Sequence, residues 1–141
     1  MKLPPLPCAC ANLRRASRAI TQLYEEELRP TRLRITQLAI LKALRTVPEL
    51  RQGRLAAAMG LDSTTLTRTL GLLRRQGYVA IRRGPDRRER HLSLTEKGMA
   101  KVEQMTPYWE RAQKRVRDAM GRDYEHLQNL LHQLTCAVGR D

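Results

Sequence analysis

The sequence contains no phenylalanine, and aromatic residues make up only 4% of its 141 residues. Proteins that hold single-stranded nucleic acid need exposed rings on which bases can stack, so this scarcity argues against that class. No apolar run approaches the roughly 20 residues that a transmembrane helix requires. Residues 1–7 carry one lysine and three prolines in place of the apolar stretch of a signal peptide. We therefore expect a cytoplasmic protein without membrane association.

Cysteine is also scarce, with only Cys8, Cys10 and Cys136. An odd, sparse set differs from the dense, even set of a secreted disulfide scaffold, which indicates reduced thiols. The sequence has no nucleophile elbow and no glycine-rich phosphate loop. His126 and His132 lie six positions apart, which is not the spacing of a shared helix face. The sequence therefore predicts neither an enzyme nor a bound cofactor, and no metal site built from histidines.

Positive charge is what the sequence has in excess. It contains 27 Lys and Arg against 14 Asp and Glu, a formal net charge of +13. Such a surplus favours a polyanionic partner, nucleic acid above all. The same charge would suit an anionic membrane surface, an architectural protein that binds DNA of any sequence, or a basic protein without such a partner.

Apolar residues recur at helical spacing near both ends of the chain. The first stripe, within residues 10–28, consists of Leu13, Ala16, Ile20, Leu23, Tyr24 and Leu28. The second, within 123–138, consists of Tyr124, Leu127, Leu131, Leu134 and Val138, at the spacing of a helix–helix seam. Another helix precedes it, and Pro107 should bend or restart that helix. A small chain has little else to cover two apolar stripes, so we expect them to bury each other across the two-fold axis of a homodimer. The alternative is a helical bundle within one chain.

The central part of the chain predicts three helices. The first covers about 35–45, with a core of Leu38, Ile40, Leu41 and Leu44. A short apolar helix over 55–59 and a turn lead to a helix over about 63–76. Asp62 or Ser63 can accept a hydrogen bond from the free amides at its start. The side chains of this last helix that we expect to face inward are Leu66, Leu70, Leu72 and Leu73.

A β-hairpin follows the third helix. Residues 78–83 and 89–94 are partly β-branched and alternating, and a Gly-Pro-Asp turn separates them. Two helices, a turn and a hairpin in this order predict a winged helix-turn-helix. The expected fold class is mainly α with a small β-hairpin wing (α+β), flanked by N- and C-terminal dimerisation helices. We assign residues 31–98 to DNA binding, and residues 1–30 and 99–141 to dimerisation.

Two surfaces of this arrangement can contact double-stranded DNA. An α-helix fits the major groove, where the base edges differ in their donors and acceptors. The helix residues predicted to face DNA are Ser63, Thr64, Thr65, Thr67, Arg68 and Arg74. The hairpin holds five arginines within residues 82–90, and Arg87 and Arg88 at its turn can enter a neighbouring minor groove. Asp86 is expected to orient a nearby arginine. A charge run of this kind can also be a merely solvated loop.

The segment from Asp86 to Gly98 resembles the signature of the MarR family. That pattern is Asp-x-Arg, three residues, an aliphatic residue, one residue and Leu-Thr-x-x-Gly, and every position matches. Residues 55–68 resemble the helix-turn-helix of the family. Leu33 and Gln37 resemble the opening of its second helix, so Gln37 joins the expected DNA-binding residues. The resemblance extends over nearly the whole chain from about residue 10.

Membership of this family would imply a homodimer whose terminal helices interlock, with each winged helix on half of a palindromic operator. Arg88 would be the minor-groove residue at the wing tip and Asp86 its support. Most members are repressors that a small ligand or thiol oxidation releases from DNA.

The cysteines are candidates for such a thiol sensor. Cys8 and Cys10 lie at the start of the first helix, where thiols tend to be reactive, and Cys136 lies near the end of the last. Residues 10–28 are similar in spacing to the first helix of organic-hydroperoxide repressors of the family, whose reactive cysteine takes the place of Cys10. The second helix, however, lacks the tyrosines that such a sensor uses. The thiols can therefore be redox sensors, ligands of a soft metal or inert.

Overall fold

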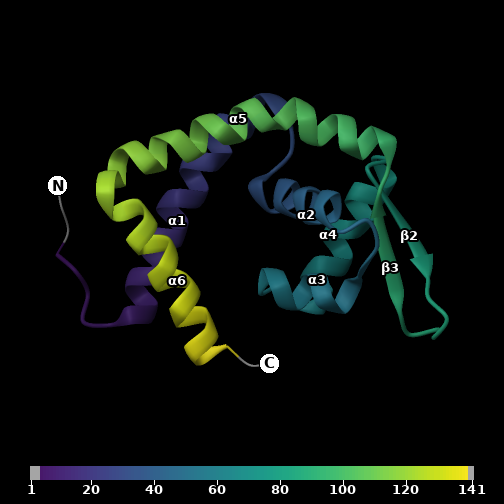
Figure 1. Cartoon of the computed structure of the whole chain (residues 1–141), viewed down its shortest axis with the longest axis horizontal. Helices are drawn as coiled ribbons and strands as arrows, with labels where there is room; N and C mark the ends of the chain where they lie inside the picture. The colour runs from purple at the N-terminus through teal and green to yellow at the C-terminus, as the bar shows by residue number, and fades with distance from the viewer. Residues whose placement is uncertain (1–3, 140–141) are drawn as a thin grey trace.

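The computed structural model describes residues 4–139. Residues 1–3 of the Pro-rich lead-in lie outside this range. The elements in chain order are α1 (Ala9–Leu28), the 3₁₀ turn η1 (Arg29–Thr31), α2 (Ile35–Thr46), β1 (Leu50–Arg51), α3 (Gln52–Met59), α4 (Ser63–Arg75), β2 (Val79–Arg83), β3 (Arg90–Leu94), α5 (Glu96–Met120), the 3₁₀ turn η2 (Gly121–Asp123) and α6 (Tyr124–Val138). Figure 1 shows α5 as a long arch with α2, α3, α4 and the hairpin at one end and α1 and α6 at the other. This arrangement confirms the predicted fold class.

The winged region holds most of the buried core. All four residues predicted as the core of α2 are buried, and they pack with residues of α3, α4, the sheet and α5. One prediction for α4 is wrong, because Leu72 is 40% exposed. Leu66, Leu70 and Leu73 already fill the inward face. At 100° per residue, Leu72 lies about 120° around the helix axis from Leu66.

The sheet has one strand that the sequence did not predict. The strands lie in the order β1-β3-β2, all antiparallel, and Leu50 of β1 pairs with Leu92 of β3. A strand of two residues is too short to show alternation, so no pattern could reveal it. Helix α3 begins directly after β1, at Gln52, three residues earlier than predicted.

The joint between β3 and α5 gives physical roles to Thr95 and Gly98 at the end of the MarR-like motif. Thr95 caps α5 by accepting a hydrogen bond from the Gly98 amide at 3.0 Å, and its hydroxyl donates to the Gly77 carbonyl at 2.6 Å. Gly98 is buried, and a Cβ at this position would lie 2.1 Å from the Tyr78 carbonyl oxygen. Only a glycine at position 98 lets the first turn of α5 approach the backbone of Tyr78, between α4 and β2, this closely.

Helix α5 continues through Pro107 without restarting. Figure 1 shows it as a shallow arch, consistent with the bend expected from a proline that donates no amide hydrogen bond. Within residues 4–139, no helix combines the length and the apolar character needed to span a bilayer.

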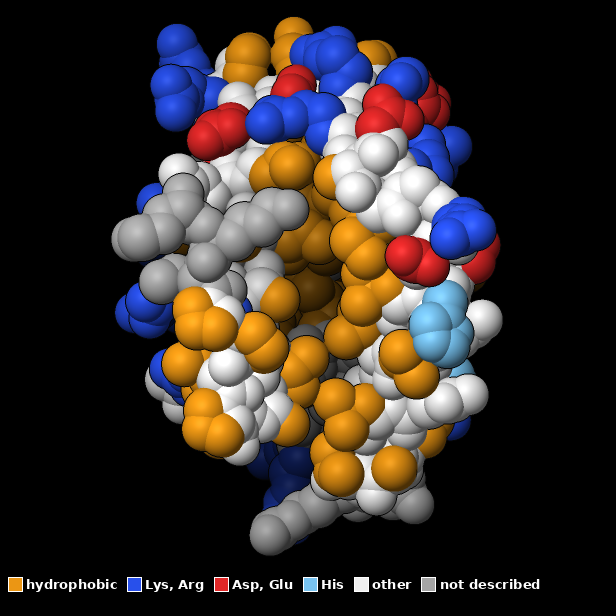
Figure 2. All heavy atoms as spheres, turned by 90° about the vertical axis from the view of Figure 1, so that its left-hand side faces the viewer, with side chains coloured by type: hydrophobic (Ala, Val, Ile, Leu, Met, Phe, Trp, Pro, Cys, Tyr) orange, Lys and Arg blue, Asp and Glu red, His pale blue; other side chains and the backbone are white. Residues whose placement is uncertain are grey.

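The terminal helices remain largely uncovered in one chain. Helix α6 has no buried residue, and Leu28 is the only buried residue of α1. Figure 2 shows an apolar hollow on this side of the molecule. Exposed large apolar side chains on the two helices are Leu13, Ile20, Leu130, Leu131, Leu134 and Val138.

Candidate nucleic-acid interface

Helix α4 presents a polar outer face while its leucines anchor it in the core. Ser63, Thr64, Thr67, Arg68 and Arg74 are all exposed, as predicted. The helix begins at the Asp62 cap, where the carboxylate accepts a hydrogen bond from the Thr65 amide at 2.8 Å. A rigid helix with an exposed row of hydroxyl and guanidinium groups suits the major groove.

Thr65, unlike its neighbours on α4, bonds to the residue that caps the helix. Its hydroxyl donates to the second carboxylate oxygen of Asp62 at 2.7 Å, and the side chain is only partly exposed. Hydrogen bonds from the hydroxyl and the amide of Thr65 lower the pKa of Asp62. Thr65 therefore secures the start of α4, and its hydroxyl proton is engaged there.

A residue of α3 contacts the outer face of α4. The Gln52 amide nitrogen donates to the Thr67 hydroxyl oxygen at 2.9 Å. Because this hydroxyl accepts from Gln52, its own proton is left to donate outward to an acceptor on DNA. Fifteen residues separate the two, so the sequence offered no signal for this contact.

The wing is built around Asp86. Its carboxylate accepts a hydrogen bond from the Arg88 backbone amide at 3.0 Å, and its carbonyl accepts from the Glu89 amide at 2.9 Å. We expected Asp86 to orient an arginine, and within residues 4–139 it forms no ion pair with a guanidinium. It shapes the turn through the backbone instead, which leaves the side chains of Arg87 and Arg88 exposed at the tip.

The base of the wing carries a bridge of alternating basic and acidic side chains. The imidazole of His91 on β3 lies between two carboxylates, with Nδ1 at 3.3 Å from Glu49 and Nε2 at 3.4 Å from Glu89. Arg82 pairs with Glu49, and Arg51 lies 3.1 Å from Glu89. The guanidinium of Arg82, and then the neighbouring His91, lower the pKa of Glu49. This bridge links β1 to both arms of the hairpin.

Gly84 leaves room for the imidazole of His91. A Cβ on Gly84 would be 2.6 Å from Nε2 of His91. The predicted turn residue therefore also makes room for the bridge, which only the structure reveals.

A cavity of about 430 Å³ lies between α3, α4 and the wing. Arginine side chains from three elements surround it, and Ser63 and Glu89 also line it. Its arginines are Arg51, Arg54, Arg88 and Arg90. Positive potential concentrates in such a concave site, so this surface attracts phosphate groups.

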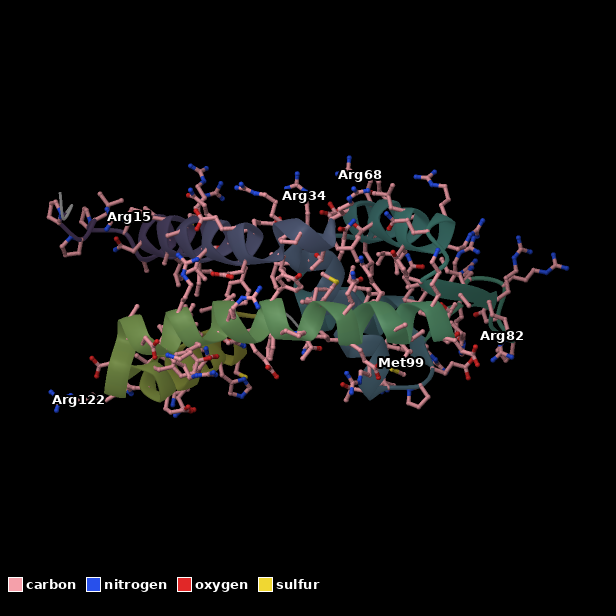
Figure 3. All side chains as sticks on the ribbon, turned by 90° about the horizontal axis from the view of Figure 1, so that it is seen from above. Arg15, Arg34, Arg68, Arg82, Met99 and Arg122 are labelled. Carbon is pink, nitrogen blue, oxygen red and sulfur yellow. The ribbon has the colours of Figure 1, made fainter. Side chains whose placement is uncertain are left out.

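Gln37 serves the start of α2. Its side-chain carbonyl accepts a hydrogen bond from the Arg34 amide at 2.8 Å, as in a capping box. The predicted role of Gln37 in DNA binding would therefore fall to its NH₂ group. Arg34, which precedes the helix, is exposed and projects from the same side of the molecule as Arg68 in Figure 3.

Comparisons with known proteins agree with a winged helix-turn-helix. The model of the MarR family matches residues 32–89. The chain is 30% identical to the uncharacterized HTH-type transcriptional regulator YwoH of Bacillus subtilis over 93 residues, which cover 66% of this chain and 68% of that protein. It is 35% identical to the M. tuberculosis transcriptional regulator MosR, solved in complex with DNA, with a TM-score of 0.84 over 92% of this chain and 95% of that chain.

The chain belongs to the MarR family. A mutant of E. coli MarR in complex with operator DNA shares the fold, with a TM-score of 0.77, 23% identity and coverage of 86% of this chain and 89% of that chain. The protein is thus a MarR-family transcriptional regulator. The family and its curated homologue are regulators of transcription, in agreement with the expectation that this chain is not an enzyme.

The thiols of this MarR-family protein are accessible. Cys8 and Cys10 at the start of α1 and Cys136 on α6 are all exposed and free. Nε2 of His132 lies 3.7 Å from the Cys136 sulfur, one helical turn away. The two residues are four positions apart, a spacing that places side chains on one face of a helix. Within residues 4–139, no three His, Cys, Asp or Glu side chains form a group suited to a metal ion.

Proposed function

We propose that this protein is a homodimeric repressor that binds a palindromic DNA operator with α4 in the major groove and the wing tip in the minor groove. The observation that carries the proposal is the pair of exposed surfaces, Ser63–Arg68 on α4 and Arg87–Arg88 on the wing, joined through one buried core. The DNA complex of MosR, at 35% identity, supports it. The proposal also implies a cytoplasmic protein, because an operator is reached only where the chromosome lies.

The contacts divide into three kinds. The hydroxyls and Arg68 on α4 can address base edges, which differ from one base pair to the next. The arginines around the cavity beside α3 address phosphates, which position the protein without reading sequence. The wing arginines are attracted by the negative potential of a narrow minor groove.

A direct test compares affinities at one stated salt concentration. The wild-type protein selects duplexes from a random-sequence library, and the selected duplex and a scrambled duplex are then titrated. We expect the selected duplex to bind at least about 10³-fold more tightly. A ratio near one would favour the architectural alternative and refute the proposal.

Substitution of Arg88 tests the wing. Arg88→Ala should weaken binding to the selected duplex by about 1–3 kcal/mol, because a groove contact is lost. Arg122→Ala is a control with the same loss of charge, since Arg122 is exposed and projects from the opposite side in Figure 3. Equal affinities of Arg88→Ala and wild type would exclude the wing from the interface.

The dimer follows from the uncovered terminal helices. An amphipathic helix without a buried residue is expected to have a partner, and the apolar hollow beside α1 and α6 in Figure 2 suits the same helices of a second copy. Two copies related by a two-fold axis present two α4 helices, which matches a palindrome. Sedimentation as a monomer at micromolar concentration would contradict this part of the proposal.

A small ligand or thiol modification would release the dimer from DNA. The exposed thiols at the start of α1 lie on a helix of the proposed dimer interface, so a change there can alter the separation of the two α4 helices. The mobility of the DNA complex is measured with and without a hydroperoxide, for wild type and Cys10→Ser. Equal mobility in all four samples would refute thiol release and leave a small ligand. A reporter gene behind the selected duplex tests repression, which an increase of expression with the protein would contradict.

A further inference from the structure

The first four turns of α1 carry an unusual charge pattern. Residues 9–24 contain no acidic residue, and their only charged side chains are Arg14, Arg15 and Arg18. All three are exposed, and within residues 4–139 none has a carboxylate within ion-pair distance. Both terminal nitrogens of Arg15 donate to the Pro4 carbonyl, each at 3.5 Å. A carbonyl leaves the positive charge uncompensated.

The strip continues beyond the helix. Arg29, Arg32 and Arg34 at the joint between α1 and α2 are exposed as well. The acidic residues of this region have other partners: Glu25 accepts a hydrogen bond from the Ile35 amide at 3.0 Å, and Glu26 and Glu27 pair with Arg115. Glu25 and Glu26 also line a shallow pocket together with Arg29, Arg32 and Arg34. We call the set Arg14, Arg15, Arg18, Arg29, Arg32 and Arg34 the basic strip.

The basic strip faces the same side as the recognition helix. Figure 3 shows Arg15, Arg34 and Arg68 projecting from one side of the molecule and Arg122 from the other. A hydrogen bond and a buried side chain also stabilise the joint between the basic strip and the winged region. Lys101 of α5 donates to the Thr31 carbonyl at 2.8 Å, and the Thr31 side chain is buried. The strip and α4 therefore lie on the same side of the molecule in a fixed arrangement.

Dimerisation leaves the arginines of α1 uncovered. At 100° per residue, Arg14, Arg15 and Arg18 centre roughly 150° around the helix axis from the stripe through Leu13 and Ile20. A second copy that covers the apolar stripe therefore faces away from the arginines. Because α1 and α6 lie at the opposite end of α5 from the winged region (Figure 1), the proposed dimer places the two α1 helices between the two winged regions. Their arginines would then face the centre of the operator.

From these observations we infer that the basic strip binds the DNA backbone between the two half-sites. From Arg29 back to Arg14 the helix rises about 22 Å, the length of about six base pairs, with a phosphate charge about every 1.7 Å of duplex. The inference rests on the proposed function, and it adds a phosphate-binding surface outside the helix-turn-helix and the wing. The strip presents guanidinium groups without an aromatic or apolar anchor, which favours a rigid polyanion over a membrane surface.

The salt dependence of DNA binding tests this inference. The probe is a duplex of about 30 base pairs, three helical turns, selected by the wild-type protein. Each phosphate contact contributes about 0.9 to the slope of log K against log salt concentration. Because each substitution occurs twice in a dimer, Arg15→Gln should lower the slope by up to about 1.8, and the triple variant of Arg14, Arg15 and Arg18 by up to about 5. Arg122→Gln is the matched control and should keep the wild-type slope.

A modified duplex locates the contact. Neutral methylphosphonate linkages replace the phosphates between the half-sites. Wild type should then bind with the reduced slope of the triple variant, and the triple variant should lose nothing further. If the modified duplex reduced the slopes of both proteins equally, the strip would not contact these phosphates.

Three outcomes would overturn the inference. A triple variant with the wild-type slope would show that the strip does not bind DNA. A triple variant that sediments as a monomer would place the arginines in the subunit interface. An equal loss for Arg122→Gln would show a general effect of net charge. In each case a loss of affinity on Arg88→Ala would leave the proposed function standing, so the two failures are distinguishable.

Discussion

Replacement of Gly98 by alanine tests whether the joint between the wing and α5 is as tight as the structure shows. The added methyl group would lie 2.1 Å from the Tyr78 carbonyl oxygen and 2.7 Å from Cδ1 of Leu94. The leucine can change rotamer, but the carbonyl belongs to the backbone and also accepts a hydrogen bond from the Thr95 amide at 3.1 Å. The clash can be relieved only by a shift of the first turn of α5.

The expected cost follows from two opposing effects. Overpacking of a well-packed site costs about 1–3 kcal/mol, and a clash with backbone belongs at the upper end. Alanine in a helix gains about 1 kcal/mol over glycine. The Gly98→Ala variant should therefore lose about 2 kcal/mol of unfolding free energy, or about 4–8 °C in Tm for a domain of this size.

Gly71 provides the matched control. It lies inside α4, and a Cβ there would meet nothing within 4 Å. Gly71→Ala should therefore gain about 1 kcal/mol from helix propensity alone. Thermal and urea unfolding of both variants should be measured at one protein concentration, because a dimer's stability depends on it. If Gly98→Ala were as stable as wild type, or if both variants shifted in the same direction, the account of the joint would be wrong.

Three further predictions concern the cap of α4, an ion pair and the dimer. Asp62→Ala should lower Tm because α4 loses its N-cap, whereas Asp62→Asn should largely preserve it, since asparagine caps equally well; equal losses would contradict the capping role. Arg115, and then Arg111, lower the pKa of Glu27 below its ordinary value of 4.5, so Glu27 stabilises the fold above that value and ceases to do so as the pH falls through its lowered pKa. Glu27→Gln should therefore lower Tm at pH 7, and the difference from wild type should shrink as the pH falls below 4.5 and disappear below the lowered pKa of Glu27; a difference independent of pH would refute this. Leu134→Glu should raise the dimer dissociation constant by roughly 100-fold or more, because a charge enters the apolar seam; an unchanged sedimentation coefficient at all concentrations would place the seam elsewhere.

Local features of the sequence were sufficient to predict most elements of the fold. The repeat of Leu38, Ile40, Leu41 and Leu44 marks a buried helix, and the structure confirms it. Asp62 was one of two candidates for the cap of α4, and its carboxylate accepts the hydrogen bond. These predictions succeeded because each depends on residues within about one or two turns of one another, where periodicity and capping act.

Prediction failed for features that depend on residues far apart in the sequence or on which face of a helix is already filled. The apolar character of Leu72 was not enough to predict whether it is buried, because other leucines already fill the inward face of α4. Strand β1 exists only because Leu50 meets Leu92, and two residues carry no pattern of their own. The position of His91 between Glu49 and Glu89 depends likewise on a sheet that joins distant segments.

The sequence by itself determined the order of helices and strands, the MarR-like motif and the excess of positive charge. It also placed the arginines of α1 on the face opposite the apolar stripe, because a helix fixes that angle. Only the tertiary structure decided which charges act together. Whether Arg15 lies on the same side as Arg68 depends on how α1 packs against α2 and α5 and how α4 packs against α3 and β2, and such packing between distant segments leaves no periodic trace in the sequence.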